Sequence, residues 1–162
     1  MASHVPLRLV AASLRERDAR LLVDEVQAEY VERYGSPDEA PLDESELDPP
    51  AGAFFLGYAG DVAVAMGGWK SRSGVHPWGL SNIAEVKRMY VAPAARRRGY
   101  ARRVLTHLEE TARRAGVQAL VLETGTAQPE AIAMYASDGY ELIENFGYYA
   151  WSPMVRSFGK RL

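Results

Sequence analysis

Residues 86–101 read VKRMYVAPAARRRGYA, and this stretch predicts a strand, a tight basic loop and the start of a helix. The strand is indicated by β-branched and aromatic residues at Ile83, Val86, Tyr90 and Val91. The helix is indicated by apolar residues along one face, at Val104, Leu105, Leu108, Ala112 and Ala115, ahead of Gly116 as a stop. We therefore expect a strand and a helix to meet at a cluster of arginines.

The basic loop has the composition of an anion site. Arg96, Arg97 and Arg98 precede Gly99, so backbone N–H groups and the positive end of the helix converge there. Gly99 has no Cβ and lets a phosphate approach the main chain closely. The loop lacks the Gly-Lys-Ser/Thr of a P-loop and the Gly-x-Gly-x-x-Gly of a dinucleotide fingerprint, so neither of those sites is predicted.

The spacing Arg-x-x-Gly-x-Ala, from Arg96 to Ala101, resembles the pyrophosphate-binding signature of the GNAT superfamily of N-acetyltransferases. The later elements of that superfamily follow in order: a strand at 119–123, a helix containing Ala131 and Tyr135, and the pair Gly139-Tyr140. The resemblance covers about residues 84–149. It implies an α/β (α+β) fold with a mixed, mostly antiparallel central sheet flanked by helices on both faces. It also implies acetyl-CoA as co-substrate.

Periodicity and turn residues give the remaining elements. They predict strands at 5–10, 53–58, 62–69, 140–143 and 154–158, and helices at 18–34 and from Pro129 to about Ser137. Strands 53–58 and 62–69 form a hairpin around Gly60. Residues 36–50 contain four prolines and six carboxylates without Lys or Arg, which is typical of a loop.

Composition limits the class of protein. The chain has 162 residues, 48% hydrophobic and 25% charged, and a formal net charge of −2, which indicates one globular domain over residues 1–162 without bulk affinity for nucleic acid. No cysteine is present, so disulfides, thiolate metal sites and a cysteine nucleophile are excluded. Residues 1–13 do not resemble a leader peptide, and no stretch of 18 apolar residues occurs, so we expect a cytoplasmic protein without a membrane partner.

The resemblance also implies site residues. A bulge in the central strand would free main-chain N–H groups to polarise the thioester, and Gln128 would contact the cofactor where relatives often have Asn. The cofactor-binding residues implied in this way are Met89, Tyr90, Val91, Arg96, Arg97, Arg98, Gly99, Tyr100, Ala101 and Gln128. Glu85 is the candidate general base, with a cross-strand partner of Lys87 or Arg88 as the alternative and Glu123 as the reserve. Tyr135 is the candidate acid that protonates the departing thiolate; the alternative is a core tyrosine.

Other side chains receive no catalytic role. His4, His76 and His107 are too scattered for a metal site, and His107 is expected on the exposed side of its helix. The aromatic residues outside the motifs favour core or loop packing over an acceptor pocket, namely Trp69, Trp78, Tyr148 and Tyr149.

The leading hypothesis is an N-acetyltransferase that moves the acetyl group of acetyl-CoA directly to a primary amine of a small molecule, because no cysteine can carry the acetyl group. The acidic loop 38–48 suggests a cationic acceptor, although carboxylates that only solvate the loop explain it equally well. The alternatives are a non-catalytic coenzyme-A-binding module, acetylation of a protein amino terminus or lysine, and a nucleic-acid-binding domain that uses the arginines on phosphates. Relatives are often dimers, so a homodimer is an expectation from the resemblance.

Overall fold

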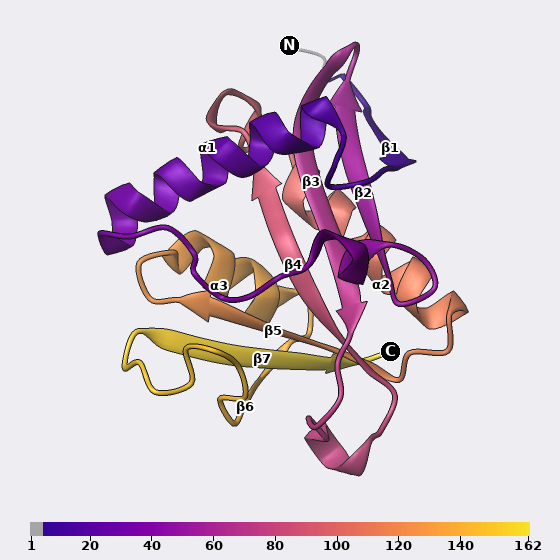
Figure 1. Cartoon of the computed structure of the whole chain (residues 1–162), viewed down its shortest axis with the longest axis vertical. Helices are drawn as coiled ribbons and strands as arrows, with labels where there is room; N and C mark the ends of the chain where they lie inside the picture. The colour runs from indigo at the N-terminus through magenta and orange to yellow at the C-terminus, as the bar shows by residue number, and fades with distance from the viewer. Residues whose placement is uncertain (1–4) are drawn as a thin grey trace.

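The structure is a computed structural model that describes residues 5–162, so His4 and the first part of the segment examined for a leader lie outside the described residues (Figure 1). The strands are β1 Leu7–Ala11, β2 Gly52–Ala59, β3 Val62–Ser71, β4 Ile83–Val91, β5 Ala119–Gly125, β6 Glu141–Ile143 and β7 Val155–Arg161. The helices are α1 Arg17–Tyr34, α2 Tyr100–Arg114 and α3 Pro129–Ser137. Short 3₁₀ turns occupy Glu44–Leu47, Pro77–Gly79 and Pro93–Ala95.

The seven strands form one sheet in the order β1-β2-β3-β4-β5-β7-β6. Among the described strands, only β4 and β5 pair in parallel, and the other neighbours are antiparallel. The predicted mixed, mostly antiparallel sheet is therefore confirmed.

Helices cover both faces of the sheet, as predicted. On one face, α2 and α3 pack in a core that includes Val104, Leu108 and Tyr135. On the other face, α1 packs Leu22 and Val26 against β2, β3 and β4 (Figure 1). Burial of each such aliphatic side chain stabilises the fold by about 1.5–3 kcal/mol.

The central pair of strands separates part-way along its length. β4 and β5 pair only over Ile83–Ala119, Ala84–Leu120 and Glu85–Val121. Beyond that point β4 continues with β3 as far as Val91, while β5 continues with β7 as far as Gly125. The result is a split in the sheet, along which the edge of β4 that faces β5 has no partner strand.

β4 has a bulge shortly after the point where it separates from β5. Tyr90 is opposite Met66 and Lys87 is opposite Gly68, so Arg88 and Met89 together oppose Gly67. Arg88 adopts a left-handed conformation with φ of 59°, which is strained for a residue other than glycine. The bulge implied by the resemblance is therefore confirmed.

Several sequence expectations differ from the structure at their ends. The first strand is Leu7–Ala11 instead of 5–10, because its pairing with β2 begins at Leu7 and ends at Ala11. The last strand is Val155–Arg161 instead of 154–158, because β5 offers partners as far as Ala119. The strand expected at 140–143 begins at Glu141, since the Tyr140 N–H bonds the Tyr135 carbonyl and closes α3.

The expectation for His107 was wrong. Its ring is half-buried and meets the ring of Phe55 edge-on at 4.5 Å between centroids, and burial lowers the pKa of His107. His107 is thus a packing residue between α2 and β2.

Candidate active site

The loop between β4 and α2 presents a run of free backbone donors. The Arg96 N–H bonds the Pro93 carbonyl and the Arg103 N–H bonds the Gly99 carbonyl, but within residues 5–162 the N–H groups of 97–102 have no acceptor. Positive φ angles of 66° at Arg97 and 77° at Gly99 turn these donors toward a common region. Consecutive N–H groups in such a turn, at the positive end of a helix, form an anion-binding concavity.

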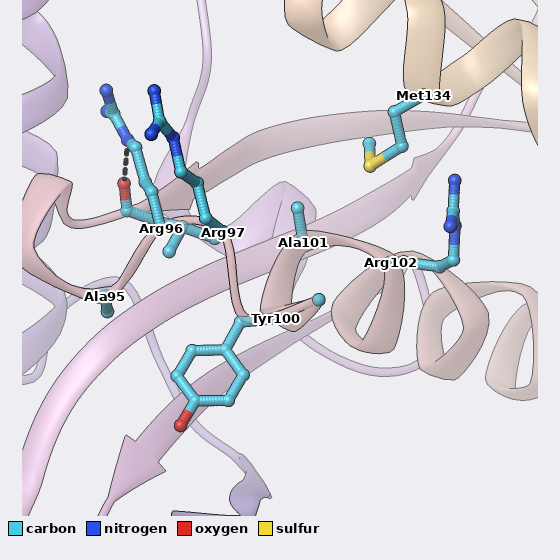
Figure 2. A pocket seen from close by; sticks show the side chains of 9 residues that line it. Ala95, Arg96, Arg97, Tyr100, Ala101, Arg102 and Met134 are labelled. Atoms are coloured by element: carbon cyan, nitrogen blue, oxygen red, sulfur yellow. Dashed lines mark hydrogen bonds between the residues drawn. The ribbon is translucent and has the colours of Figure 1, made fainter. Parts of the chain in front are cut away.

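A cavity of about 230 Å³ opens on this loop. It is lined by Val91, Ala95, Arg96, Arg97, Gly99, Tyr100, Ala101, Arg102 and Met134. Figure 2 shows Met134 of α3 reaching toward Ala101, while the side chains of Arg96 and Arg97 extend together from the other end of the loop. No atom lies within 4 Å of the position that a Cβ on Gly99 would occupy, so the main chain there is open to a ligand. This arrangement fits the diphosphate that the sequence predicts.

The arginines of the loop differ in how they are used. Arg96 donates through Nε to the Val91 carbonyl at 2.9 Å and pairs with Glu29 of α1 at 2.9 Å, so it ties the loop to α1. Arg102 pairs with Asp138 of α3 at 2.9 Å. Arg97 and Arg98 make no ion pair or hydrogen bond within residues 5–162. The first arginine of the motif is thus engaged by the protein, and the next two are available to a ligand.

The predicted pantetheine edge lies along β4 after the bulge. The side chains of Met89 and Val91 pack with the α2 face, whereas Tyr90 is buried against α1 and donates to Glu25 at 3.3 Å. Burial and the nearby Glu25 carboxylate raise the pKa of Tyr90 to about 12. The side chains of all three residues therefore pack in the two cores, so only their main-chain groups can contact a ligand in the split.

The predicted base, Glu85, lies where β4 and β5 begin to separate. It is 4% exposed, and both carboxylate oxygens contact cations: Oε1 lies 3.2 Å from Nε of Arg72 and Oε2 lies 3.1 Å from Nζ of Lys87. The alternative, a cross-strand partner for Lys87 or Arg88, is present in part: Glu85 pairs with Lys87, but the two lie on the same strand. Glu85 is a buried carboxylate without a free oxygen.

The reserve candidate, Glu123, has a free oxygen. Glu123 lies on β5 two residues past the last β4–β5 pair, on the same face as Glu85, and its Oε2 is buried without a hydrogen-bond partner. Gly147 packs directly against the carboxylate, and a Cβ at that position would lie 1.3 Å from Oε1. Burial raises the pKa of Glu123, and the neighbouring Glu85 carboxylate raises it further. A carboxyl group with a raised pKa suits proton abstraction near neutral pH.

The predicted acid, Tyr135, points from α3 into the core beside Tyr140 and Phe158, at 5.6 and 6.3 Å between ring centroids. Its hydroxyl makes no hydrogen bond to any described residue. Burial, and then the neighbouring Tyr30 hydroxyl of α1, raise the pKa of Tyr135, so the hydroxyl stays protonated.

Gln128 is held by α1. Its Oε1 accepts a hydrogen bond from the Tyr34 hydroxyl at 3.2 Å, and the Tyr34 side chain fills the space beside Gly125 at the end of β5. Arg33 adds a hydrogen bond to the Ala127 carbonyl at 2.8 Å. The carbonyl of the Gln128 amide is thus occupied, which leaves its NH₂ group as the part that can meet a ligand.

The acidic loop makes internal contacts. Asp43 and Glu46 form a capping box on the turn Glu44–Leu47, and Glu46 also pairs with Lys70 at 2.7 Å. Asp38 is fixed near the split, where its Oδ1 accepts from the Tyr149 hydroxyl at 3.0 Å. Only this part of the loop borders the candidate site.

Sequence reasoning missed the contact between Asp38 and Tyr149 beside the split. Trp69 packs in the core and donates to Thr111 at 3.0 Å, and the Trp78 ring lies under Arg161 at 4.7 Å, as expected for packing. Tyr148 is 51% exposed. No sequence signal distinguishes these tyrosines, because their roles depend on how the loop after β6 folds back.

The sequence profile of the Acetyltransferase (GNAT) family matches residues 19–140, which is most of the chain. The chain belongs to the GNAT acetyltransferase family. The matched region contains α1 from Ala19 onward, the split, the loop at Gly99 and α3, but not the loop after β6.

Known proteins resemble this GNAT domain in sequence and in structure. It is 46% identical over 70 residues to an IAA acetyltransferase of Azospirillum brasilense, a match that covers 43% of this chain and 46% of that protein. A putative acyl-CoA N-acyltransferase from Klebsiella pneumoniae superposes with a TM-score of 0.78 at 25% identity, over 98% of this chain and 99% of that one. A PaiA N-acetyltransferase from Thermoplasma acidophilum, solved in complex with coenzyme A, superposes with a TM-score of 0.70 at 12% identity, over 97% and 99% of the two chains.

Residues 5–162 lack two kinds of feature. No helix there combines the length and apolar character that a membrane span requires. No group of three or more His, Asp or Glu side chains in that range is arranged to hold a metal ion.

Proposed function

We propose that this GNAT protein transfers the acetyl group of acetyl-CoA directly to a primary amine of a small molecule, within a ternary complex. The observation that carries the proposal is the adjacency of the free donors of 97–102 to the split between β4 and β5. A diphosphate held by those donors leaves the pantetheine arm to follow the unpartnered edge of β4. We place the thioester in the split, with Glu123 on one face of the sheet and Tyr135 of α3 on the other.

The bound acetyl-CoA supplies the thioester carbonyl that the amine attacks. The main chain of β4 after the bulge donates hydrogen bonds toward the carbonyl oxygen, where negative charge develops. A proton leaves the acceptor ammonium, and the neutral amine attacks the carbonyl to form the C–N bond. The nitrogen then loses a second proton, the C–S bond breaks, and a proton reaches the departing sulfur, so that one proton is released overall. Tyr135 is assigned the last step, because a protonated, unpaired hydroxyl is available there.

We assign the first proton transfer to Glu123 in preference to Glu85. Both oxygens of Glu85 are occupied by Arg72 and Lys87, whereas Oε2 of Glu123 is free and the pKa of Glu123 is raised. Abstraction of a proton by a positioned side chain contributes roughly 10²–10⁴-fold to a rate. Glu85 stays a prediction as an alternative base.

Calorimetric titration with acetyl-CoA, followed by a thiol-release assay over a panel of small amines, tests this proposal. We expect binding with a defined stoichiometry and turnover that requires the amine. Initial-rate patterns should be those of a ternary complex, since the chain has no cysteine to carry an acetyl group. Absence of binding would refute the proposal. Binding without turnover on any amine, small or in a peptide, would instead identify a non-catalytic coenzyme-A-binding module.

The ion pairs support this reading over the nucleic-acid alternative. Arg96 and Arg102 are paired with Glu29 and Asp138, so the loop does not display a continuous row of free cations for a phosphate backbone. We expect no salt-dependent affinity for generic DNA or RNA.

A further inference from the structure

Arg88 is a mostly buried cation without a hydrogen bond. Its side chain is 15% exposed, and its Nε is buried with no partner. An arginine carries five N–H donors, and burying them without acceptors is costly. Within residues 5–162 the one carboxylate near the guanidinium belongs to Asp38, with 3.9 Å between Nη1 and Oδ2, which is too long for a hydrogen bond.

Asp38 is held at that distance by other contacts. Its Oδ1 accepts from the Tyr149 hydroxyl and from the Ala40 N–H, each at 3.0 Å. Its own backbone N–H donates to Oε1 of Gln27 in α1 at 2.7 Å. These bonds fix Asp38, and its ion pair with Arg88 stays at 3.9 Å, beyond hydrogen-bond distance.

The backbone also fixes Arg88 in place. It occupies the bulge of β4 with φ of 59°, three residues beyond the last pair between β4 and β5. The neighbouring cations, Arg72 and Lys87, are already paired with Glu85. Arg88 is therefore the cation on this part of the described sheet whose donors remain available.

A free carboxylate lies on the other arm of the split. Glu123 on β5 keeps an oxygen without a hydrogen-bond partner. The loop after β6 links it to Arg88, because Gly147 packs against the Glu123 carboxylate and the Tyr149 hydroxyl bonds Asp38, which lies 3.9 Å from Arg88. The split thus offers a guanidinium from β4 with one long ion pair and no hydrogen bond, and a carboxyl oxygen from β5 with no hydrogen bond. A molecule with one anionic and one amino group complements this pair.

We propose that Arg88 binds a carboxylate of the acceptor, so that the acceptor is an amino acid or a similar small molecule whose primary amine lies a few bonds from a carboxylate. This inference rests on the proposed acetyl transfer and narrows its substrate class. The carboxylate fixes the acceptor on β4, and the amine turns toward Glu123 and the thioester.

The test compares each of the twenty common L-amino acids with its α-carboxamide in the thiol-release assay, at saturating acetyl-CoA. The carboxamide retains the amine and the side chain but removes the charge that Arg88 would bind. We expect at least one amino acid to exceed its carboxamide by about ten- to a hundredfold in kcat/KM, as a charge-assisted bidentate contact provides. Arg88→Gln should reduce that preference to less than about threefold, mainly through KM, and Arg88→Lys should retain part of it.

Arg156→Gln is the matched control, because it removes the same charge from a guanidinium that already bonds the Pro153 and Val155 carbonyls. It should leave the preference unchanged. The inference is overturned if no amino acid is acetylated better than its carboxamide, or if none is acetylated at all. It is also overturned if Arg88→Gln keeps the full preference for the carboxylate. Calorimetry with acetyl-CoA on the same samples separates this result from failure of the proposed function, since intact binding with no carboxylate preference refutes only the role of Arg88.

Discussion

Gly99→Ala should weaken acetyl-CoA binding by more than its effect on stability can explain. Gly99 has φ of 77°, a conformation that costs a residue with a Cβ about 1–2 kcal/mol. No atom lies within 4 Å of the added Cβ, so the substitution creates no clash in the free protein. The methyl group projects instead into the space where a diphosphate would approach the donors of 97–102.

The size of the effect follows from the contacts that the methyl group would displace. Loss of one hydrogen bond between an N–H group and a charged phosphate costs about 1.5–3 kcal/mol. Since 1.4 kcal/mol corresponds to a factor of ten, the Kd for acetyl-CoA should rise about ten- to a hundredfold. Calorimetric titration measures this change, and denaturant unfolding measures the accompanying loss of stability.

Gly60→Ala is the matched control for this substitution. Gly60 lies in the β2–β3 hairpin with φ of 62°, also has no atom within 4 Å of its Cβ position, and does not line the cavity. Both variants should lose about 1–2 kcal/mol of stability, but only Gly99→Ala should lose affinity. Equal acetyl-CoA affinity in the two variants would refute the assignment of this loop to the diphosphate.

Three further variants test the other parts of the site and the core. Glu123→Gln should lower kcat by roughly 10²–10⁴-fold. In the wild type, kcat should fall as the pH drops through the raised pKa of Glu123. If the variant shows the same fall of kcat at low pH, Glu123 is not the base. The same raised pKa means that burial of Glu123 destabilises the fold above that pKa, so Glu123→Gln should increase the free energy of unfolding at pH 8 and not at pH 4. Tyr135→Phe keeps the ring in the core and should lower kcat at least tenfold with an unchanged acetyl-CoA Kd; an unchanged kcat would leave Tyr135 as a core residue. Glu109→Ala removes the buried acceptor of the Tyr140 hydroxyl and the ion-pair partner of Lys160. Chemical denaturation should show that the free energy of unfolding falls by about 1–3 kcal/mol. A smaller fall than for the exposed control Glu110→Ala would contradict this account.

The secondary structure was readable from the chain because local patterns specify it. The alternation and β-branching around Val91, the apolar face from Val104 to Ala112, and Pro129 at the start of α3 all predict elements that the structure contains. The ends of the outer strands were not readable, because a strand ends where its neighbour ceases to offer partners, as β7 does opposite Ala119.

The chemical inventory of the site was also available from the sequence. The arginines, Gly99 and the candidate acid and bases were named from their residue types and spacing. Their ion pairs could not be predicted, because the partner of an arginine depends on which segment of the chain packs against it. Arg96 is tied to Glu29, 67 positions away along the chain, whereas Arg97 remains free.

Tertiary structure decided which carboxylate keeps an oxygen without a partner and which cation has no hydrogen bond. Glu85 and Glu123 look alike in sequence, but Arg72 and Lys87 converge on the first, while Gly147 packs over the second and leaves an oxygen without a partner. Arg88 reads as an ordinary strand residue until the register between β3 and β4 shifts by one and creates the bulge. Local sequence thus determines the elements and their chemistry, whereas pKa values and unpaired charges follow from burial and from long-range neighbours, which exist only once the sheet has formed.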